Sequence, residues 1–205
     1  MEVPPPPTVP MHRVGFNDFP TDSDGIIRRN LIFVRSQEGG FYSFALRVVL
    51  AFHRASPLVV RAEEHHLYLG QTALEVLSGQ AGGYQAVDNR GYQILLRYRH
   101  PSSLARQISI SQVLSGQFEP SWIANQIVLV GTTAPSLKDQ FYTPFSFNQD
   151  QNLTMPGVAI HAQMISQLLD AIAGKPALYQ FFTPLGENWP GCGRAVCWRQ
   201  VWPGG

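Results

Sequence analysis

The sequence is poor in cysteine and carries no excess of charge of either sign. Its 205 residues include 2 cysteines, and 15 lysines and arginines are balanced by 14 aspartates and glutamates. A formal net charge of +1 provides no global field that would attract nucleic acid or an anionic membrane surface. We therefore expect no nucleic-acid partner, and we expect any partner to be recognised through local contacts.

The two cysteines, Cys192 and Cys197, lie in a C-terminal stretch rich in glycine and arginine. No histidine or acidic pair stands near them at the spacing of a zinc site, so we expect no metal there. A local disulfide and two free thiols are both compatible with the pattern. No other motif is typical of a cofactor site, and we expect no cofactor.

Long apolar runs are also missing. A helix that crosses a bilayer needs about 20 apolar residues, whereas the nearest run, residues 44–52, is shorter and contains Arg47. The start of the chain is rich in proline and has neither the basic beginning nor the apolar middle of a secretory signal. We therefore expect neither a membrane span nor a signal peptide within this sequence.

What the sequence does contain is a core and one very regular stretch, residues 126–172. Apolar residues make up 44% of the chain, which is enough for a hydrophobic core. The stretch opens with a branched apolar run, 127–130, that is typical of a strand covered on both faces. After a polar loop, 131–139, it closes with a predicted helix over 157–172. Spacings of four and three residues place these apolar side chains on one side of that helix: Val158, Ala162, Ile165, Leu169 and Ile172.

Further strands are predicted upstream. Residues 13–20 and 26–34 are typical of an antiparallel hairpin around an Asp- and Gly-rich turn at 21–25. Residues 92–98 predict another strand, because aromatic and branched residues follow a turn. A weaker pattern at 67–69 is compatible with one more strand.

Two more helices complete the prediction. Residues 41–53 predict a helix with Phe41, Phe44 or Ala45, Val48 and Phe52 on one face. Residues 108–116 predict a short helix, with Ser109 or Ser111 as its N-cap and Gly116 after its end. We therefore predict an α/β fold, a mixed sheet with helices packed on it, in one domain.

Several of these stretches, in this order, resemble the CHASE2 domain, an extracytoplasmic sensor module of bacterial signalling receptors, especially cyanobacterial ones. The matching stretches are 13–20 with 22–29, 43–47, 88–98, 127–139 with 142–145, and 155–163. The resemblance implies a non-catalytic ligand-sensing domain set between membrane helices. Such a domain passes its signal to an adenylate cyclase, a histidine kinase or a Ser/Thr kinase.

The resemblance also implies how the chain is organised. Residues 1–10 form a Pro-rich start without fixed structure, residues 11–175 form the sensor domain, and residues 176–205 form an irregular tail. Members of the family have a further strand and helix before the segment that matches Arg13, and they continue into membrane helices where the tail stands here. We therefore expect a fragment, and a tail read out of frame would account for the missing membrane helices.

In the intact receptor, the resemblance places the domain on the periplasmic side of the plasma membrane. It would be held there only through segments missing from this chain. The ligand is an unknown small molecule or environmental stimulus, and the pattern leaves a homodimer open. The competing interpretation is a small soluble α/β enzyme or a stand-alone interaction domain.

The candidate ligand site begins in the loop after the predicted strand 127–130. Thr132, Thr133, Ser136, Lys138 and Asp139 follow that strand, where an α/β sheet gathers ligand-binding groups. The loop lacks the second glycine and the hydroxyl of a phosphate-binding loop. In the alternative interpretation, Thr132 and Ser136 satisfy loop amides, while Lys138 and Asp139 are solvated or paired with each other.

His161 is the remaining candidate, in the first turns of the predicted helix 157–172. A histidine at this position is either a hydrogen-bonded core residue, or a ligand contact or pH-sensitive group. We include it in the candidate ligand site. This choice predicts that the loop 131–139 and the start of the helix meet in space.

No feature of the sequence predicts catalysis or a metal site. There is no nucleophile elbow and no pair of carboxylates at catalytic spacing, so we predict no catalytic residue and no enzyme. Asp22 and Asp24 resemble the start of a calcium loop, but its distal ligands are missing, so turn chemistry explains them better. Arg28 and Arg29 either hold an anionic ligand or extend into solvent.

Overall fold

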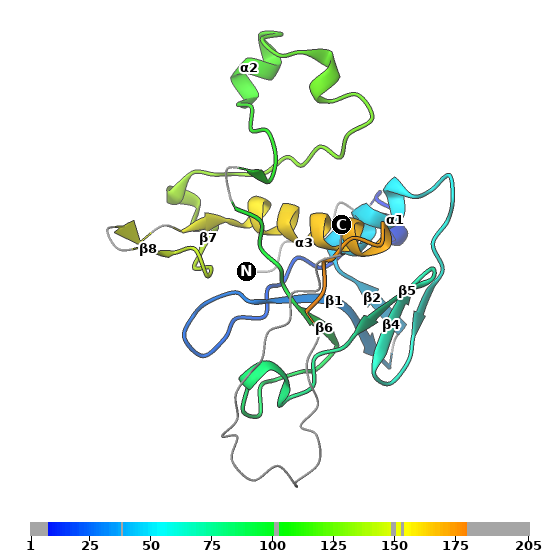
Figure 1. The fold of residues 1–205 in the computed structure, drawn as a ribbon. Helices are drawn as coiled ribbons and strands as arrows, with labels where there is room; N and C mark the ends of the chain where they lie inside the picture. The colour runs from blue at the N-terminus through cyan, green and yellow to red at the C-terminus, as the bar shows by residue number, and fades with distance from the viewer. Residues whose placement is uncertain (1–7, 38, 101–102, 149–150, 153, 180–205) are drawn as a thin grey trace, which may run out of the picture.

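A computed structural model describes residues 8–37, 39–100, 103–148, 151–152 and 154–179. The predictions for residues 1–7 and for residues 180–205, which include both cysteines, lie outside the described residues. The predicted α/β class is confirmed, because helices pack over small antiparallel sheets (Figure 1). The elements are β1 (Arg29–Ser36), β2 (Gly39–Tyr42), α1 (Phe44–Phe52), β3 (Val60–Ala62), β4 (His66–Leu69), β5 (Thr72–Glu75), β6 (Tyr92–Leu95), α2 (Ile110–Leu114), β7 (Gln140–Phe141), β8 (Phe147–Asn148), β9 (Gln151–Asn152), β10 (Met155–Pro156) and α3 (Gly157–Ile172).

Strand β1 is the centre of the main sheet. It pairs antiparallel with β2 on one side and with β6 on the other, and the register shifts between Leu31 and Phe33. Ile32 of β1 and Ile94 of β6 are both buried in the core. A second antiparallel sheet has the order β3-β4-β5. The predicted strands around Ile32, Ile94 and 67–69 are therefore confirmed.

The predicted hairpin between residues 13–20 and 26–34 is wrong. Residues 13–20 form no strand, and their segment makes isolated bridges, one from Phe16 to Ser43 and one from Thr21 to Ile27. The reason is competition for partners. The backbone of Ile26 and Ile27 pairs with Tyr142, and β1 itself is already flanked by β2 and β6.

Helix α1 is confirmed, but its buried face is shifted from the predicted one. Ala45, Leu46 and Val49 are fully buried, whereas Phe52 is 51% exposed and Phe41 lies before the helix begins. The shift arises because α1 packs mainly against α3 and not flat on the sheet. The N-cap of α1 is Ser43, whose side chain accepts a hydrogen bond from the Leu46 amide.

We expect Ser43→Ala to lower the free energy of unfolding by about 1 kcal/mol, because the buried amide of Leu46 loses its acceptor. Urea unfolding measures the change. Ser109 caps the short helix α2 in the same manner and provides the matched control. Helix α2 has no buried residue, so Ser109→Ala should change global stability less. Equal effects of both substitutions would contradict this account.

Helix α3 confirms the prediction at 157–172, yet it is more enclosed than predicted. None of its residues is exposed, because α1 packs on one side and the backbone after β6 contacts another. Of the predicted apolar stripe, Ile165 is buried and the other members are half-buried. The fully enclosed side chains include two glutamines, Gln163 and Gln167, which bond to backbone groups. Gly174, at φ +69°, follows the helix end, a position that favours glycine.

The predicted strand at 126–130 is wrong. Among the described residues no strand pairs with this segment, and its side chains alternate in exposure. Ile127 and Leu129 pack against the core, while Val128 is 52% and Val130 89% exposed. A branched apolar run has strong β-propensity, but without a neighbouring strand it has no ladder to join. The segment is therefore an extended connection that covers one side of the core.

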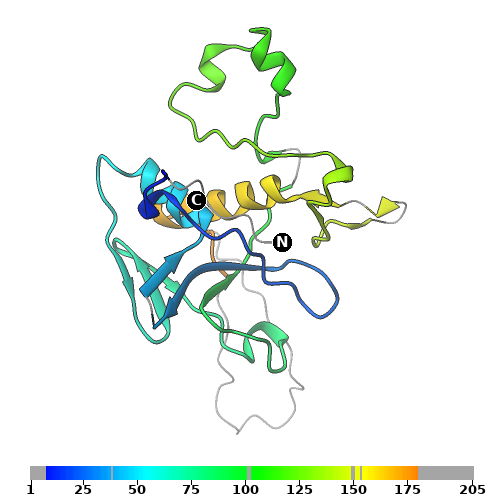
Figure 2. The ribbon, with the colours of Figure 1, turned by 180° about the vertical axis from the view of Figure 1, so that it is seen from behind.

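Helix α2 stands apart from the body of the molecule, as both ribbon views show (Figures 1 and 2). It is capped as predicted, since Ser109 accepts from the Gln112 amide and the Gln112 side chain accepts from Ser109. Gly116 follows its end at φ +71°. Within the described part of the chain, no helix is both long and apolar enough to span a bilayer.

Candidate functional site

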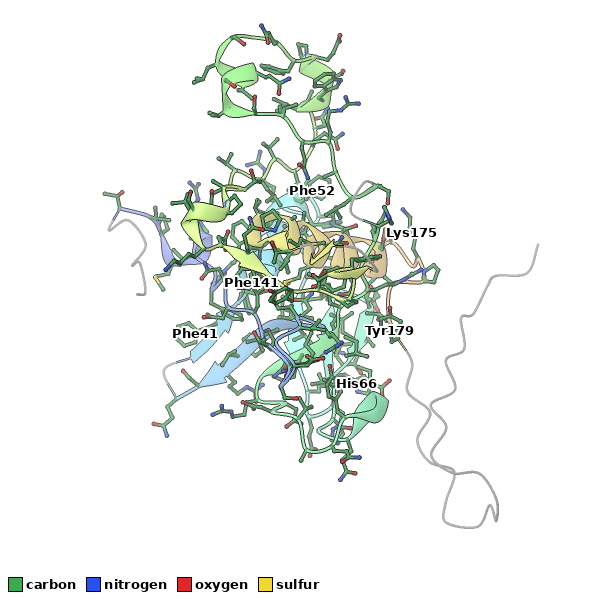
Figure 3. The ribbon with its side chains drawn as sticks, turned by 90° about the vertical axis from the view of Figure 1, so that its left-hand side faces the viewer. Phe41, Phe52, His66, Phe141, Lys175 and Tyr179 are labelled. Atoms are coloured by element: carbon green, nitrogen blue, oxygen red, sulfur yellow. The ribbon has the colours of Figure 1, made fainter. Side chains whose placement is uncertain are left out.

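The polar loop 131–139 and the start of α3 lie together in space. Strand β7 pairs antiparallel with β10, and the Gly157 amide donates to the Asp139 carbonyl at 3.2 Å. The approach is close enough to require glycine. A Cβ at Gly157 would lie 2.5 Å from Asp139 Oδ1, and one at Gly131 would lie 2.5 Å from Val158 Cβ. Phe141 of β7 lies beside the first turns of α3 (Figure 3).

The loop side chains divide into those that hold the loop and those that face outward. Thr132 Oγ1 accepts from the Ala134 amide at 3.2 Å, and the Thr133 carbonyl accepts from Gln140 at 3.1 Å. Ser136 lies in a 3-10 turn and is exposed. Lys138, in the left-handed region at φ 57°, is exposed. No salt bridge joins it to Asp139 within the described residues.

His161 lies below this loop, between aromatic rings. Its ring centroid is 4.6 Å from that of Phe19 and 5.1 Å from that of Phe44. Burial lowers the pKa of His161 to about 4, and the charge of Asp139 opposes that effect. The histidine is therefore neutral at pH 7. Its buried Nδ1 has no hydrogen-bond partner among the described residues, so the hydrogen bond of the alternative interpretation is not made at this nitrogen.

The structure thus brings Asp139 and His161 together and leaves Thr133, Ser136 and Lys138 exposed on the loop surface. None of the candidate residues lines either of the two cavities described below. The candidate site is a surface formed by a loop and a helix start, with His161 beneath it. Its binding role stays a prediction.

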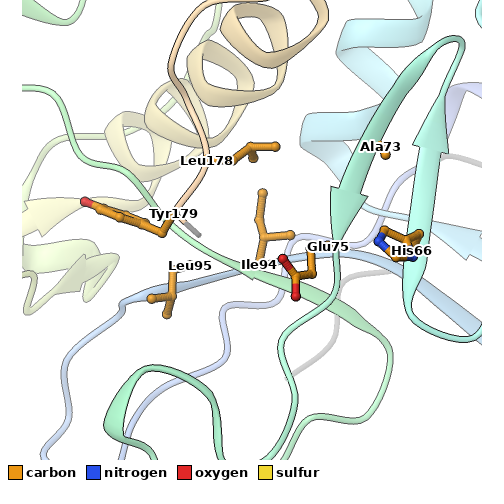
Figure 4. A pocket seen from close by; sticks show the side chains of 7 residues that line it. All are labelled: His66, Ala73, Glu75, Ile94, Leu95, Leu178 and Tyr179. Atoms are coloured by element: carbon orange, nitrogen blue, oxygen red, sulfur yellow. The ribbon is translucent and has the colours of Figure 1, made fainter. Parts of the chain in front are cut away.

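The first cavity lies between the second sheet and the segment after α3. It holds about 210 Å³ and is lined by His66, Ala73, Glu75, Ile94, Leu95, Leu178 and Tyr179 (Figure 4). His66 and Glu75 are direct cross-strand partners of β4 and β5. The remaining wall is largely apolar, so this cavity can enclose a small apolar group beside one polar edge.

The second cavity lies at the C-terminal end of α3, and we call it the α3-end cavity. It holds about 450 Å³ and is lined by Arg97, Tyr98, Arg99, His100, Ser103, Gln167, Asp170, Lys175, Pro176 and Ala177. One feature of the sequence indicates this cavity, although the prediction above does not use it. Arg97 and Arg99 follow strand β6 at a spacing of two, which places alternate side chains of an extended segment on one side.

A buried ionic cluster explains the charged turn at residues 21–29. The carboxylate of Asp22 accepts from Arg29 Nε at 2.7 Å, from Arg28 Nη1 at 2.9 Å and from Tyr84 Oη at 2.7 Å. Arg29 is 3% exposed and also donates to the Asp88 carbonyl. Burial raises the pKa of Tyr84, and the Asp22 carboxylate raises it further.

Arg29 therefore neither binds an anionic ligand nor extends into solvent, and both predictions for it are wrong. Its side chain is buried and its charge is neutralised by the Asp22 carboxylate. Arg28 pairs in addition with Asp24, whose other contact is a turn bond to the Ile26 amide. This agrees with turn chemistry at Asp24, whereas the Asp22 carboxylate serves the buried ionic cluster. In the described part of the chain, no three His, Cys, Asp or Glu side chains are grouped to hold a metal ion.

Comparison with known protein families matches the model of the CHASE2 domain to residues 2–197. The match covers nearly the whole chain and includes the loop 131–139, α3 and the α3-end cavity. No curated protein and no solved structure matches the chain.

Proposed function

The chain belongs to the CHASE2 domain family, a family of extracytoplasmic sensor domains, and from this premise we propose that it is the ligand-sensing domain of a transmembrane signalling receptor. The domain itself is non-catalytic and lies on the periplasmic side of the membrane. It passes its signal to an adenylate cyclase, a histidine kinase or a Ser/Thr kinase. Its ligand is a small molecule, recognised without nucleic acid.

The proposed recognition surface is the loop 131–139 together with the start of α3. Its residues are Thr132, Thr133, Ser136, Lys138, Asp139 and His161. The observation that supports it is the attachment of the loop to the helix through the β7–β10 pair and the Gly157–Asp139 hydrogen bond. A ligand that contacts the loop therefore acts on α3 as well.

Sensing requires that the ligand bind one conformation better than another. Helix α3 is the element suited to carry such a change, because it begins at the recognition surface and ends at Ile172, where the chain leads on toward the expected membrane segments. His161 adds a group that is neutral at pH 7 and has an unpartnered Nδ1. That nitrogen can accept a hydrogen bond when the loop above it moves or binds a ligand.

In the intact receptor, we expect Lys138→Ala and His161→Ala to shift the dose response to higher stimulus, by about tenfold each if each removes one ligand hydrogen bond. Expression of Lys138→Ala should stay at the wild-type level, because Lys138 is exposed. The readout is the activity of the receptor's own output domain against stimulus concentration.

Arg54→Ala is the matched control, since Arg54 is an exposed cation just after α1. Its dose response should equal that of the wild type. Should both Lys138→Ala and His161→Ala respond like the wild type, the recognition surface would lie elsewhere.

A further inference from the structure

The α3-end cavity has a strong local imbalance of charge. Three of its side chains are lysine or arginine, Arg97, Arg99 and Lys175, and a single carboxylate, that of Asp170, faces them. Asp170 pairs with Arg99 and, at 3.5 Å, with Lys175. Arg97 has no acidic partner among the described residues. The cavity therefore holds an excess of positive charge in a protein whose overall charge is close to zero.

The two walls of the cavity are held in place by buried glutamines of α3. Gln163, fully buried, accepts from the Arg99 amide and donates to the Arg99 carbonyl, each at 2.8 Å. Gln167 donates to the Leu95 carbonyl at 2.8 Å and to the Ala177 carbonyl at 3.1 Å. The backbone that carries the arginines and the segment after α3 are thus both fixed to the same helix. A cavity with fixed walls loses little entropy on binding a ligand.

The polar lining also contains hydrogen-bond donors of the kind that bind an oxyanion. A guanidinium presents parallel N–H donors that fit a carboxylate or a phosphate in a bidentate manner. Arg97 can offer its whole fork, because no described carboxylate occupies it, and Lys175 supplies a further cation from the segment after α3. A volume of about 450 Å³ lies in the range in which proteins enclose small organic ligands.

We propose that the α3-end cavity binds a small dianionic oxyanion, a dicarboxylate or a phosphate group, between Arg97 and Lys175. Asp170 alone does not balance the three cations of the cavity, and the ligand supplies the remaining negative charge. The ligand also joins the segment after β6 to the segment after α3, since Arg97 belongs to the first and Lys175 to the second.

Occupancy of the cavity would hold the segment after α3 against the core. If α3 passes the receptor signal onward, this anion regulates that signal from the end of the helix opposite to the loop 131–139. This regulatory consequence rests on the proposed sensing function. The binding itself does not, and it is measured on the chain alone.

The test is a calorimetric titration of the purified full chain with succinate and, separately, with inorganic phosphate, at constant ionic strength set with chloride. We expect saturable binding of at least one of the two. Arg97→Gln should weaken that binding by about tenfold or more, because one charge-assisted donor pair is lost. Binding of succinate alone identifies a carboxylate ligand, and binding of phosphate alone identifies a phosphate ligand.

Arg90→Gln is the matched control, because Arg90 is an exposed arginine paired locally with Asp88 and does not line the cavity. Its affinity should equal that of the wild type. Lys175→Gln provides a second variant, since the Lys175 side chain is 66% exposed and its removal leaves the core intact. Failure of both anions to saturate, or wild-type affinity in Arg97→Gln and Lys175→Gln, would overturn the proposal without touching the loop site.

Discussion

Replacing Asp22 with alanine is expected to lower the free energy of unfolding by about 3–5 kcal/mol, the cost of leaving a buried charge without its partner. Asp22 and Arg29 form the most enclosed ion pair of the described chain, with side chains 6% and 4% exposed. Removal of the carboxylate strands the Arg29 guanidinium in the core. It also removes the acceptor of the Tyr84 hydroxyl, which lies 62 residues further along the chain.

Asp24→Ala is the matched control for this substitution. Asp24 pairs with the same Arg28, but its side chain is 49% exposed, so water can replace the lost partner. We expect a loss of about 0–1 kcal/mol, as for other exposed ion pairs. Urea unfolding of both variants gives the comparison. Equal losses would mean that the Asp22 cluster contributes no more than a surface pair.

The second large effect is a dependence of stability on pH that originates at His161. Its pKa is about 4 in the folded protein and 6.5 in the unfolded chain. Between these pH values the His161 side chain is protonated in the unfolded chain and neutral in the folded protein. The part of the free energy of unfolding that depends on His161 is therefore fully present above pH 6.5, and it falls as the pH is lowered toward 4. The loss amounts to on the order of 2–3 kcal/mol.

His161→Phe should remove this part of the pH dependence. A phenyl ring fits between Phe19 and Phe44, carries no proton and leaves no buried nitrogen without a partner. Carboxylates such as Asp139 titrate in both proteins, so the informative quantity is the difference in unfolding free energy between wild type and variant. We expect that difference to change between pH 6.5 and pH 4. A constant difference across this range would show that His161 is not desolvated.

Local patterns of the sequence predicted the helices well. The spacing of apolar residues identifies α1 and α3, and the capping residues Ser109 and Gly116 identify α2, because these signals act within a few residues. The buried faces were harder to predict. Helix α3 encloses Gln163 and Gln167, whose burial depends on backbone carbonyls supplied by segments far along the chain.

Pairing between distant segments could not be predicted in the same way. Residues 127–130 have the composition of a buried strand, but a strand also needs a neighbour, and the sequence does not say which segment provides it. The meeting of the loop 131–139 with α3 was predicted, since both belong to one local unit. The Asp22–Tyr84 bond joins residues that are far apart in sequence, so no local pattern reveals it. The α3-end cavity joins the segment after β6 to the end of α3, and only the spacing of Arg97 and Arg99 is visible there as a local pattern.

The central claim is that ligand binds where the loop 131–139 meets α3. Hydrogen–deuterium exchange of the intact receptor ectodomain tests it most directly, with and without the small molecule that stabilises the ectodomain most in a thermal-shift screen of metabolites. The account predicts slower exchange in residues 131–141 and 154–163 when that molecule is bound. Unchanged exchange in both segments, with protection confined to other parts of the domain, would contradict it.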